Sequence, residues 1–203
     1  VHSLRAQGDR RQYQQYMKHV LELQDNLQLK QAQIVEVLVE EGCVIGVRTQ
    51  LGAVYNAKAV IIASGAKHRP LGVEREEQLV GHGISYCALC DGAFHKGQDV
   101  AVVGGGNSAS QAAVFLSDLC KSVTVIQLFD HFTCDQKEID AMQARSNIRL
   151  LTSRQVTALE GENHLTGLKL TNPETGEKSA LPVEGLFVCI GRMADNEPFR
   201  DLI

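Results

Sequence analysis

Residues 99–128 read DVAVVGGGNSASQAAVFLSDLCKSVTVIQL, and this stretch decides the fold. The apolar run over 99–103 predicts a buried strand, three glycines make a turn, and residues 108–119 predict a helix. A second apolar run over 122–128 predicts another strand. Strand, helix and strand in this order form a βαβ unit, for which we expect parallel strands and a right-handed crossover. The sequence therefore predicts an α/β protein with a parallel sheet.

The glycine turn after the first of these strands has the spacing of a dinucleotide-binding fingerprint. Gly104 permits the tight turn, Gly106 lets phosphate oxygens approach the backbone, and Ala109 lets the helix pack closely on the sheet. The helix N-terminus offers free N–H groups and a partial positive charge to an anion. The residues expected to cradle a pyrophosphate are Gly104, Gly105, Gly106, Asn107 and Ser108. A tight turn that binds nothing is the alternative interpretation.

The end of the second strand leaves the identity of the nucleotide open. About 20 residues after the turn, the fingerprint places an acid for the ribose hydroxyl, or arginines for the 2′-phosphate of NADPH. Here the sequence is Gln127-Leu128-Phe129-Asp130, which has no arginine and has its acid past the expected position. Gln127 is the candidate for a ribose hydrogen bond. NADPH, NADH and no nicotinamide at all are the three alternatives.

Two cysteines precede the glycine turn, in the segment YCALCDG over residues 86–92. Cys87 and Cys90 have the spacing at which two thiols close a reversible disulfide, and a thiolate is the nucleophile in its exchange reactions. Asp91 follows directly, and a carboxyl there can carry the proton that exchange requires. The segment therefore predicts a redox pair with Asp91 as its proton carrier.

Two other interpretations of the cysteine pair stay open. His82 and His95 flank it, and two cysteines with two histidines are an allowed set of zinc ligands. Their spacings are not those of a common zinc finger, however, and their neighbours are small and apolar. The pair could also be chemically inert. We expect unreactive thiols at the other, scattered cysteines, which are Cys43, Cys120, Cys134 and Cys189.

On the N-terminal side, the sequence predicts a helix followed by an antiparallel meander of three strands. These elements lie at residues 8–25, 33–39, 43–48 and from 54 onward. A β-branched run over 59–63 then predicts a strand buried on both faces, which Ser64-Gly65 ends. Residues 66–98 predict loops around the cysteines.

On the C-terminal side, the sequence predicts one more helix and then a series of strands, the last of which is ended by Gly191. The helix lies at 136–145, and the strands lie at 148–151, 154–160, 165–171 and 186–190.

The composition excludes some classes of function. A formal net charge of −4 offers no basic face for nucleic acid. No stretch approaches the roughly 18 apolar residues that span a bilayer, and the N-terminus has no apolar signal region. We therefore expect a cytoplasmic protein without nucleic-acid or membrane partners. Because the cytosol keeps thiols reduced, the 6 cysteines do not indicate a structural disulfide framework.

Two segments, residues 83–92 and 97–109, resemble the pyridine-nucleotide domain of low-molecular-weight thioredoxin reductases, where a Cys pair shortly precedes the glycine turn. Residues 57–66 resemble the strand that leaves the FAD domain of that family. Residues 191–196 resemble the crossing back into it, with Asp195 in place of the usual proline. The resemblance implies a Rossmann-like two-dinucleotide-binding flavoprotein fold, with a nucleotide-binding domain inserted in a partial FAD domain.

The resemblance also implies a division of the chain and of its chemistry. Residues 1–75 would be a partial FAD domain, 76–189 an NAD(P)-binding domain that carries the Cys pair, and 190–203 the start of the return. Electrons would pass from NAD(P)H, or another donor, through FAD and the Cys pair to a protein disulfide such as that of thioredoxin. Cys90 would face the flavin and Cys87 would complete the exchange, although these roles could be swapped. The full-length protein would be a homodimer, with Gly65 and Gly191 among its cofactor-binding residues.

Three departures from that family matter. Asn107 stands where the family has Asp, and Gln127-Leu128-Phe129 stands where it has a basic run for NADPH. Ferredoxin-linked flavin disulfide reductases also lack that run, so they form an alternative. The chain shows neither the family's opening glycine turn for FAD nor its closing Gly-Asp segment, and looks like the middle of a longer protein.

Two further alternatives concern the whole chain. Residues 1–65 are similar to the FAD domain of GidA-type flavoproteins, which act on tRNA. The chain could also be an inactive fragment that binds only a nucleotide.

Overall fold

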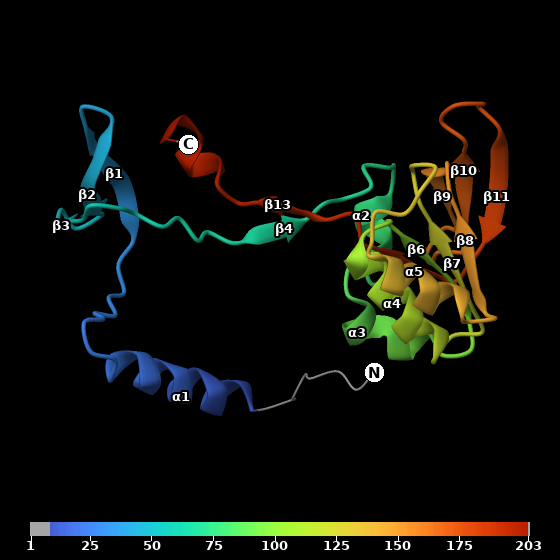
Figure 1. Cartoon of the computed structure of the whole chain (residues 1–203), viewed down its shortest axis with the longest axis horizontal. Helices are drawn as coiled ribbons and strands as arrows, with labels where there is room; N and C mark the ends of the chain where they lie inside the picture. Colours follow the sequence, from blue (N-terminus) through green and yellow to red (C-terminus); the bar gives the residue numbers. More distant parts are fainter. Residues whose placement is uncertain (1–8, 203) are drawn as a thin grey trace. The chain divides into compact units, whose positions relative to one another are not determined.

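A computed structural model of the chain describes residues 9–202. The chain divides into two compact units, Val1–Ala63 and Ser64–Ile203, and most of their helices and strands are labelled in Figure 1. Within the described residues, no helix is both long enough and apolar enough to cross a membrane.

The first unit contains the expected helix and the expected meander. Helix α1 (Arg10–Glu22) begins after Asp9, whose Oδ1 accepts hydrogen bonds from the N–H groups of Arg11 (2.8 Å) and Gln12 (3.0 Å). The residue at which we expected the helix to start, residue 8, lies outside the described range. Three antiparallel strands follow in the order β1-β2-β3. They are β1 (Ile34–Glu40), β2 (Cys43–Thr49) and β3 (Val54–Asn56).

The prediction of a buried strand over 59–63 is wrong. The backbone there is irregular, and Ile61 is 92% exposed. Among the described residues, no other strand pairs with this run. Strand propensity mostly reports how well a side chain packs on a half-buried pleated surface, so a β-branched run without such neighbours does not form a strand by itself.

The second unit is built on a five-stranded sheet with the order β5-β12-β6-β7-β8, in which every neighbouring pair is parallel. Its strands are β5 (Ile84–Ser85), β6 (Asp99–Val103), β7 (Ser122–Ile126), β8 (Ile148–Leu151) and β12 (Gly185–Val188). The predicted parallel sheet and its βαβ unit are therefore confirmed, with α4 (Asn107–Ser117) as the connecting helix.

Different elements cover the two faces of this sheet. On β6, Val100 and Val102 pack with α4 and α5 (Gln136–Gln143), whereas Ala101 and Val103 pack with the second sheet. That second sheet is antiparallel, with the order β11-β10-β9. Its strands are β9 (Gln155–Glu160), β10 (Gly167–Thr171) and β11 (Lys178–Pro182). Because both faces are covered, the central strands β6, β7 and β12 are mostly apolar, which explains their hydrophobic runs.

The region around the cysteines is more ordered than expected. Residues 66–98, predicted as loops, contain four short elements besides β5: β4 (Ala66–His68), α2 (Glu76–Leu79), α3 (Ala88–Asp91) and the 3₁₀ helix η1 (Gly92–His95). Near the C-terminus, β13 (Arg192–Ala194) pairs antiparallel with β4, with His68 opposite Arg192. A last 3₁₀ helix, η2 (Glu197–Leu202), follows. The sequence pattern did not indicate β4, β11 or β13, because most of their residues are exposed and they contain no apolar run.

Candidate functional site

The glycine turn leaves space where a phosphate is expected. Gly104 has a φ of +137°, and a Cβ at this position would lie 2.3 Å from the carbonyl oxygen of Cys189. At Gly106, the N-cap of α4, the nearest atom to such a Cβ is Thr133 Oγ1 at 3.9 Å. The backbone is thus open on the side where α4 presents its first N–H groups, which have no partners inside a helix. These residues fit the pyrophosphate of a dinucleotide.

The loop after β7 is tied to the same turn. The carbonyl oxygen of Gly105 accepts hydrogen bonds from the N–H groups of Thr133 (2.8 Å) and Cys134 (2.9 Å). The Asn107 side chain exchanges two hydrogen bonds with Asp135, accepting one from its N–H (2.9 Å) and donating one to its carboxylate (3.2 Å). The Asn107 side chain is therefore engaged in holding the loop. The backbone N–H of Asn107, in the first turn of α4, is the group of this residue that can donate a hydrogen bond to an anion.

Gln127 lies under the turn. Its side-chain amide donates to the carbonyl oxygen of His131 (3.1 Å) and accepts from the N–H of Leu128 (3.0 Å), and the residue is buried. A Cβ at Gly105 would lie 2.1 Å from its Nε2. Gln127 thus packs against the glycine turn and supports the loop, while its predicted contact with a ribose stays a prediction.

The two predicted redox cysteines are joined by a disulfide. Cys87 is half-buried at the N-cap of α3, and Cys90 is exposed within that helix. The N–H of Cys90 donates a hydrogen bond to Cys87 Sγ at 3.2 Å. A polar donor aimed at one of the two sulfurs favours the thiolate at that sulfur when the pair is reduced.

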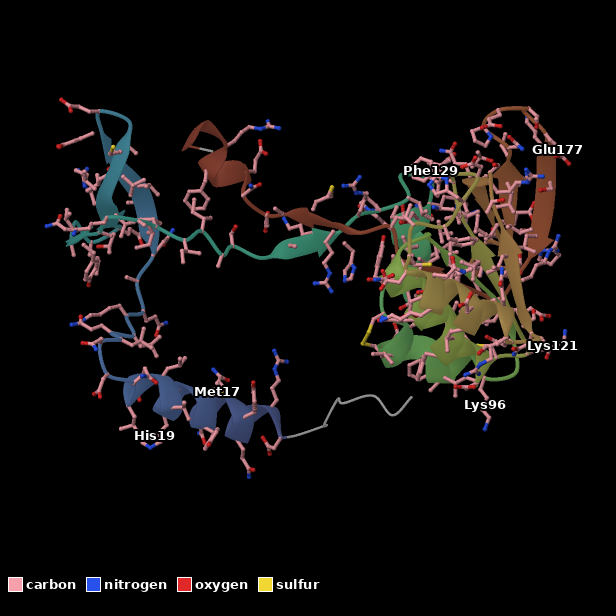
Figure 2. All side chains as sticks on the ribbon, viewed as in Figure 1. Met17, His19, Lys96, Lys121, Phe129 and Glu177 are labelled. Carbon is pink, nitrogen blue, oxygen red and sulfur yellow. A yellow bond between two sulfur atoms is a disulfide. The ribbon has the colours of Figure 1, made fainter. Side chains whose placement is uncertain are left out.

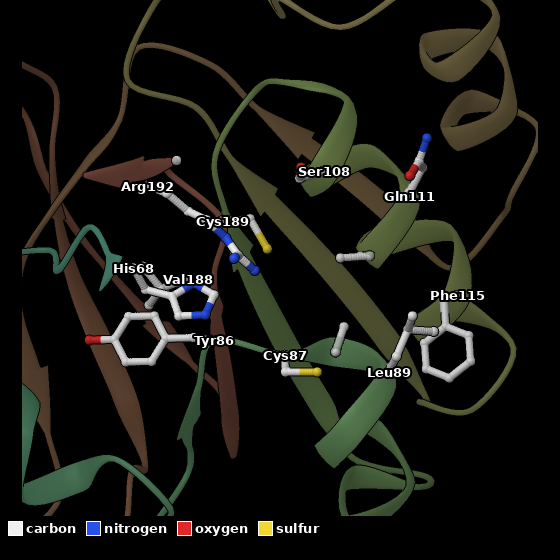
Figure 3. A pocket seen from close by; sticks show the side chains of 13 residues that line it. His68, Tyr86, Cys87, Leu89, Ser108, Gln111, Phe115, Val188, Cys189 and Arg192 are labelled. Atoms are coloured by element: carbon white, nitrogen blue, oxygen red, sulfur yellow. The ribbon is translucent and has the colours of Figure 1, made fainter. Parts of the chain in front are cut away.

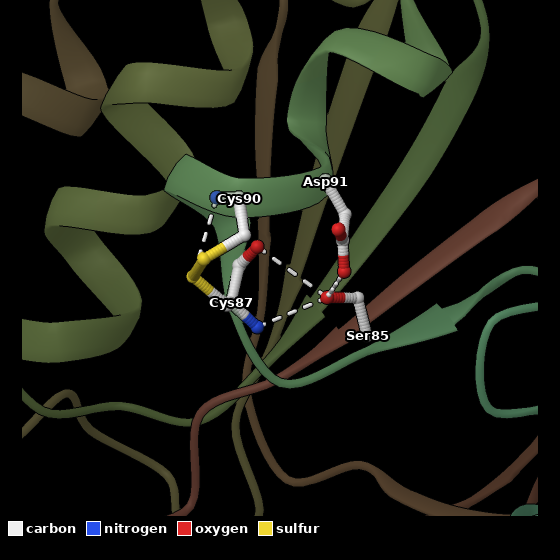
Figure 4. The surroundings of a disulfide bond; sticks show 4 residues. All are labelled: Ser85, Cys87, Cys90 and Asp91. Carbon is white, nitrogen blue, oxygen red and sulfur yellow. Dashed lines mark hydrogen bonds between the residues drawn. A yellow bond between two sulfur atoms is a disulfide. The ribbon is translucent and has the colours of Figure 1, made fainter. Parts of the chain in front are cut away.

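Asp91 is held by a residue that the sequence analysis missed. The hydroxyl of Ser85 donates a hydrogen bond to Asp91 Oδ2 at 2.6 Å, and its oxygen accepts one from the N–H of Cys87 at 3.0 Å. Figure 4 shows Ser85 between the carboxylate and the backbone of Cys87. Only its position two residues before the first cysteine could have indicated this contact, since a serine in a strand has no distinctive pattern.

One pocket of about 290 Å³ brings the disulfide and the start of α4 together. Figure 3 labels three of the residues that line this pocket: Cys87, which directly precedes α3, Gln111 on α4 and Arg192 on β13. Ser108, in the first turn of α4, and Gly191 also line it. Gly65 does not, because it lies at the opposite end of the β4–β13 ribbon, where its carbonyl oxygen accepts from the N–H of Asp195 (2.9 Å).

A buried carboxylate anchors the segment that leads to the disulfide. Glu76 accepts hydrogen bonds from the N–H groups of Leu71 and Gly72, both at 2.9 Å, and from the Tyr86 hydroxyl at 2.8 Å. Burial, together with the hydrogen bond to Glu76, raises the pKa of Tyr86 to about 12. The Tyr86 ring in turn stacks on His68, with 5.2 Å between ring centroids. The residue before Cys87 is therefore fixed on both its polar and its aromatic side.

Two further candidates remain, the thiol of Cys189 as a second reactive sulfur and the histidines His82 and His95 as zinc ligands. Cys189 borders the pocket, but burial raises the pKa of its thiol to about 11, so it is not a thiolate near neutral pH. His82 and His95, the proposed zinc partners, line a separate cavity that neither disulfide cysteine lines. Among residues 9–202, no three or more His, Cys, Asp or Glu side chains are grouped to hold a metal ion.

A parallel sheet, a glycine turn that fits a pyrophosphate and a neighbouring Cys-x-x-Cys disulfide are together typical of the nucleotide-dependent disulfide oxidoreductases as a class. The sequence comparisons agree. The family model for pyridine nucleotide-disulphide oxidoreductases matches residues 2–202, and the chain belongs to this family.

Thioredoxin reductases are among the similar proteins. The enzyme named thioredoxin reductase from Streptomyces coelicolor is 44% identical over 149 residues, which cover 73% of this chain and 46% of that protein. A bifunctional thioredoxin reductase/thioredoxin from Mycobacterium leprae is 40% identical over 169 residues, covering 83% of this chain and 36% of that protein. The crystal structure of T. acidophilum thioredoxin reductase superposes with a TM-score of 0.70 at 32% identity, covering 84% of this chain and 55% of that one.

These matches confirm the expected resemblance and fold class. The chain spans about half or less of the length of the curated relatives it matches. The expected likeness of residues 1–65 to GidA-type flavoproteins is not shown by these comparisons. The domain boundaries at 75 and 189, and the roles assigned to single residues, stay predictions.

Proposed function

We propose that this chain is the nucleotide-binding and redox-active part of a thioredoxin-reductase-like enzyme, which passes electrons from a donor through FAD to a protein disulfide. The observation that carries the proposal is the shared pocket: Cys87 and Ser108, from the redox pair and from the cradle helix, line the same hollow. A nucleotide seated on the glycine turn therefore lies beside a reversible disulfide. The similarity to thioredoxin reductases supports the same assignment.

FAD, when bound, would supply the two-electron chemistry that links the donor to the disulfide. In the described residues, the glycine turn with the geometry of a phosphate cradle is the one at 104–106, and we assign it to the other dinucleotide. The expected roles of Gly65 and Gly191 toward FAD stay predictions. What the described residues supply is the disulfide, its proton carrier and the cradle.

The exchange with a protein disulfide needs one thiolate and one proton carrier. The Cys87 thiolate, stabilised by the N–H of Cys90, attacks one sulfur of the partner disulfide, and the other partner sulfur leaves and takes up a proton. The Cys90 thiol then gives its proton to Asp91 and attacks Cys87, which closes the disulfide. The second partner sulfur leaves and takes that proton. One dithiol is oxidised and one disulfide reduced.

The cradle is better suited to a dinucleotide without a 2′-phosphate. Residues 127–136 contain no Lys or Arg, and Asp130 adds a carboxylate whose pKa is lowered by its hydrogen bond with His131. Arg154 lies next to this loop, since its backbone N–H donates to the carbonyl oxygen of Gln127, but its guanidinium is paired with Glu177 at 2.9 Å. A 2′-phosphate would find no free cation on this loop, so we propose NADH ahead of NADPH. Ferredoxin is the alternative donor.

The proposal is tested by thiol exchange on the chain itself. The chain is reduced, freed of reductant and mixed with an oxidised thioredoxin, and the disulfide transfer is followed by thiol counting. Cys90→Ser should trap the partner as a mixed disulfide on Cys87, whereas Cys87→Ser should trap little. No exchange with any protein disulfide, in a chain whose two thiols are shown to be free, would contradict the proposed function. If Gly106→Val, which fills the glycine turn, bound nucleotide as tightly as the wild type, the proposal that this turn holds the dinucleotide would be contradicted.

The wider setting is inferred from the family resemblance. We propose a full-length homodimer that works in the cytoplasm. Light scattering on the full-length product measures the oligomer, and a monomer at working concentration would contradict the first part.

A further inference from the structure

Ser85 occupies an unusual place for a serine. It is only 5% exposed, at the end of the short edge strand β5. Its hydroxyl donates to Asp91 at 2.6 Å and accepts from the N–H of Cys87 at 3.0 Å, and the Cys87 carbonyl oxygen lies 3.4 Å away. A hydroxyl is the smallest side-chain group that can donate and accept at once, so one residue satisfies both partners.

Asp91 does not line the pocket of about 290 Å³ that Cys87 borders. It lines a second cavity of about 770 Å³, together with Ser85, His82, His164 and Glu184. Cys87 lines the first pocket and not this one. In the described part of the chain, Asp91 makes no hydrogen bond to either sulfur. The contact that joins the carboxylate to the redox segment is the one through Ser85 (Figure 4).

We propose that Ser85 is a positioning residue of the disulfide relay, which holds the Asp91 carboxylate between the Cys pair and the second cavity. This inference rests on the proposed function. In the exchange described above, a proton leaves the second cysteine thiol and ends on the departing partner sulfur. Asp91, which lines the second cavity, carries that proton from the one sulfur to the other. Ser85 moves no electrons and takes no proton itself.

Because Ser85 acts through Asp91, its removal should matter only while Asp91 can carry a proton. Without the hydroxyl, the carboxylate loses its donor and the Cys87 N–H loses its acceptor, so the carboxylate is free to turn into the cavity. A serine that only supports the backbone of Cys87 would instead add its effect to that of a change at Asp91, because its contribution would not pass through the carboxylate.

The test is a double-mutant cycle on the whole chain. Reduced wild type, Ser85→Ala, Asp91→Asn and the double variant are mixed with glutathione disulfide, and the exchange rate is followed by mass spectrometry after an acid quench. We expect Asp91→Asn to slow exchange by about 10²-fold and Ser85→Ala to slow it by about 10-fold. The double variant should be no slower than Asp91→Asn alone. Ser85→Thr, which keeps the hydroxyl, should stay within about threefold of wild type.

Ser117→Ala serves as the matched control. Ser117 is also a buried hydroxyl, but its Oγ donates to the Val114 carbonyl oxygen within α4. We expect wild-type exchange from it. Circular dichroism checks that each variant is folded, and Ser85→Gly replaces Ser85→Ala in the cycle if the alanine variant does not fold.

Additive losses in the double variant, or wild-type exchange in Ser85→Ala, would overturn the proposal while leaving the redox role of the Cys pair intact. Absence of exchange in the wild type would instead refute the proposed function.

Discussion

The helix that follows the glycine turn and the redox segment border one pocket, yet the turn and the redox segment are held in place by different interactions. The turn at 104–106 is set by close backbone approach, since a Cβ at Gly104 would lie 2.3 Å from the Cys189 carbonyl oxygen. The redox segment over 85–91 is held by side-chain hydrogen bonds from Ser85, Glu76 and Asp91. Changes in the first should therefore affect the fold and nucleotide binding, and changes in the second should affect chemistry while the fold persists.

The largest expected effect comes from the cysteines. Cys87→Ser and Cys90→Ser should each abolish complete disulfide turnover, because a single thiol cannot resolve the mixed disulfide it forms. The fold should persist, since neither sulfur belongs to the apolar core clusters. Counting the product thiols tests the loss of turnover. The urea unfolding midpoint, compared between reduced wild type and reduced variants, tests whether the fold persists. A variant that turns over repeatedly would contradict the relay.

A pair of glycine substitutions separates fold from binding. Gly106→Val should fold, because a Cβ there meets only Thr133 Oγ1 at 3.9 Å. It should weaken dinucleotide binding by about 10- to 100-fold, since the added bulk displaces phosphate from backbone N–H groups whose hydrogen bonds contribute about 1.5–3 kcal/mol. Calorimetric titration with NADH measures this. An unchanged NADH affinity in Gly106→Val would contradict the assignment of this turn as the phosphate-binding site.

Gly104→Ala should behave in the opposite way. Its φ of +137° and the 2.3 Å approach to a backbone carbonyl make it costly, and we expect a loss of about 3 kcal/mol or more in the free energy of unfolding. Gly97→Ala is the control, because Gly97 also has a positive φ (+77°) but no atom within 4 Å of the added Cβ. It should lose only about 1–2 kcal/mol. Equal losses at the two positions would show that the close approach of the Cys189 carbonyl oxygen to Gly104 does not contribute to the destabilisation.

The loop after β7 gives a smaller effect. Leu128 and Phe129 are both exposed, at 43% and 55%, and the Phe129 side chain is labelled in Figure 2. Leu128→Arg should raise NADPH affinity by about tenfold and leave NADH nearly unchanged, because a charge-assisted hydrogen bond to a 2′-phosphate contributes about 1.5 kcal/mol or more. Leu128→Gln, of similar length without the charge, is the control. Tighter binding of NADPH than of NADH by the wild type would reverse our assignment of the donor.

Tyr86 offers the mildest test. Its pKa of about 12 in the folded protein lies above the ordinary value of 10.0. The folded state holds this proton more tightly than the unfolded state. The stability it contributes is therefore complete below about pH 10 and is lost as the pH rises toward 12. Tyr86→Phe should show a shallower loss of stability between about pH 10 and 12 and one fewer late-ionising phenol in an absorbance titration. Identical profiles would show that the Glu76 contact does not hold the phenol.

Local pattern was sufficient where a run of neighbours fixes the structure. The apolar runs of β6 and β7, the glycine turn between them, and the Cys-x-x-Cys spacing each lie within a few residues, so the parallel sheet and the pairing of the two cysteines could be predicted. The run over 59–63 shows the limit: its composition indicates a strand, but Ile61 is 92% exposed, because a strand also needs a neighbour.

By itself, the sequence determined the βαβ unit, the cysteine pair that forms the disulfide and the family to which the chain belongs, since these follow from residue type and spacing. Only the tertiary structure decided that Ser85 meets Asp91, that Gln127 supports the turn, and that Cys87 and Arg192 border one pocket. Such contacts join residues that are separate in the chain or unremarkable in type. They are set by how strands, helices and loops pack, which no local spacing encodes.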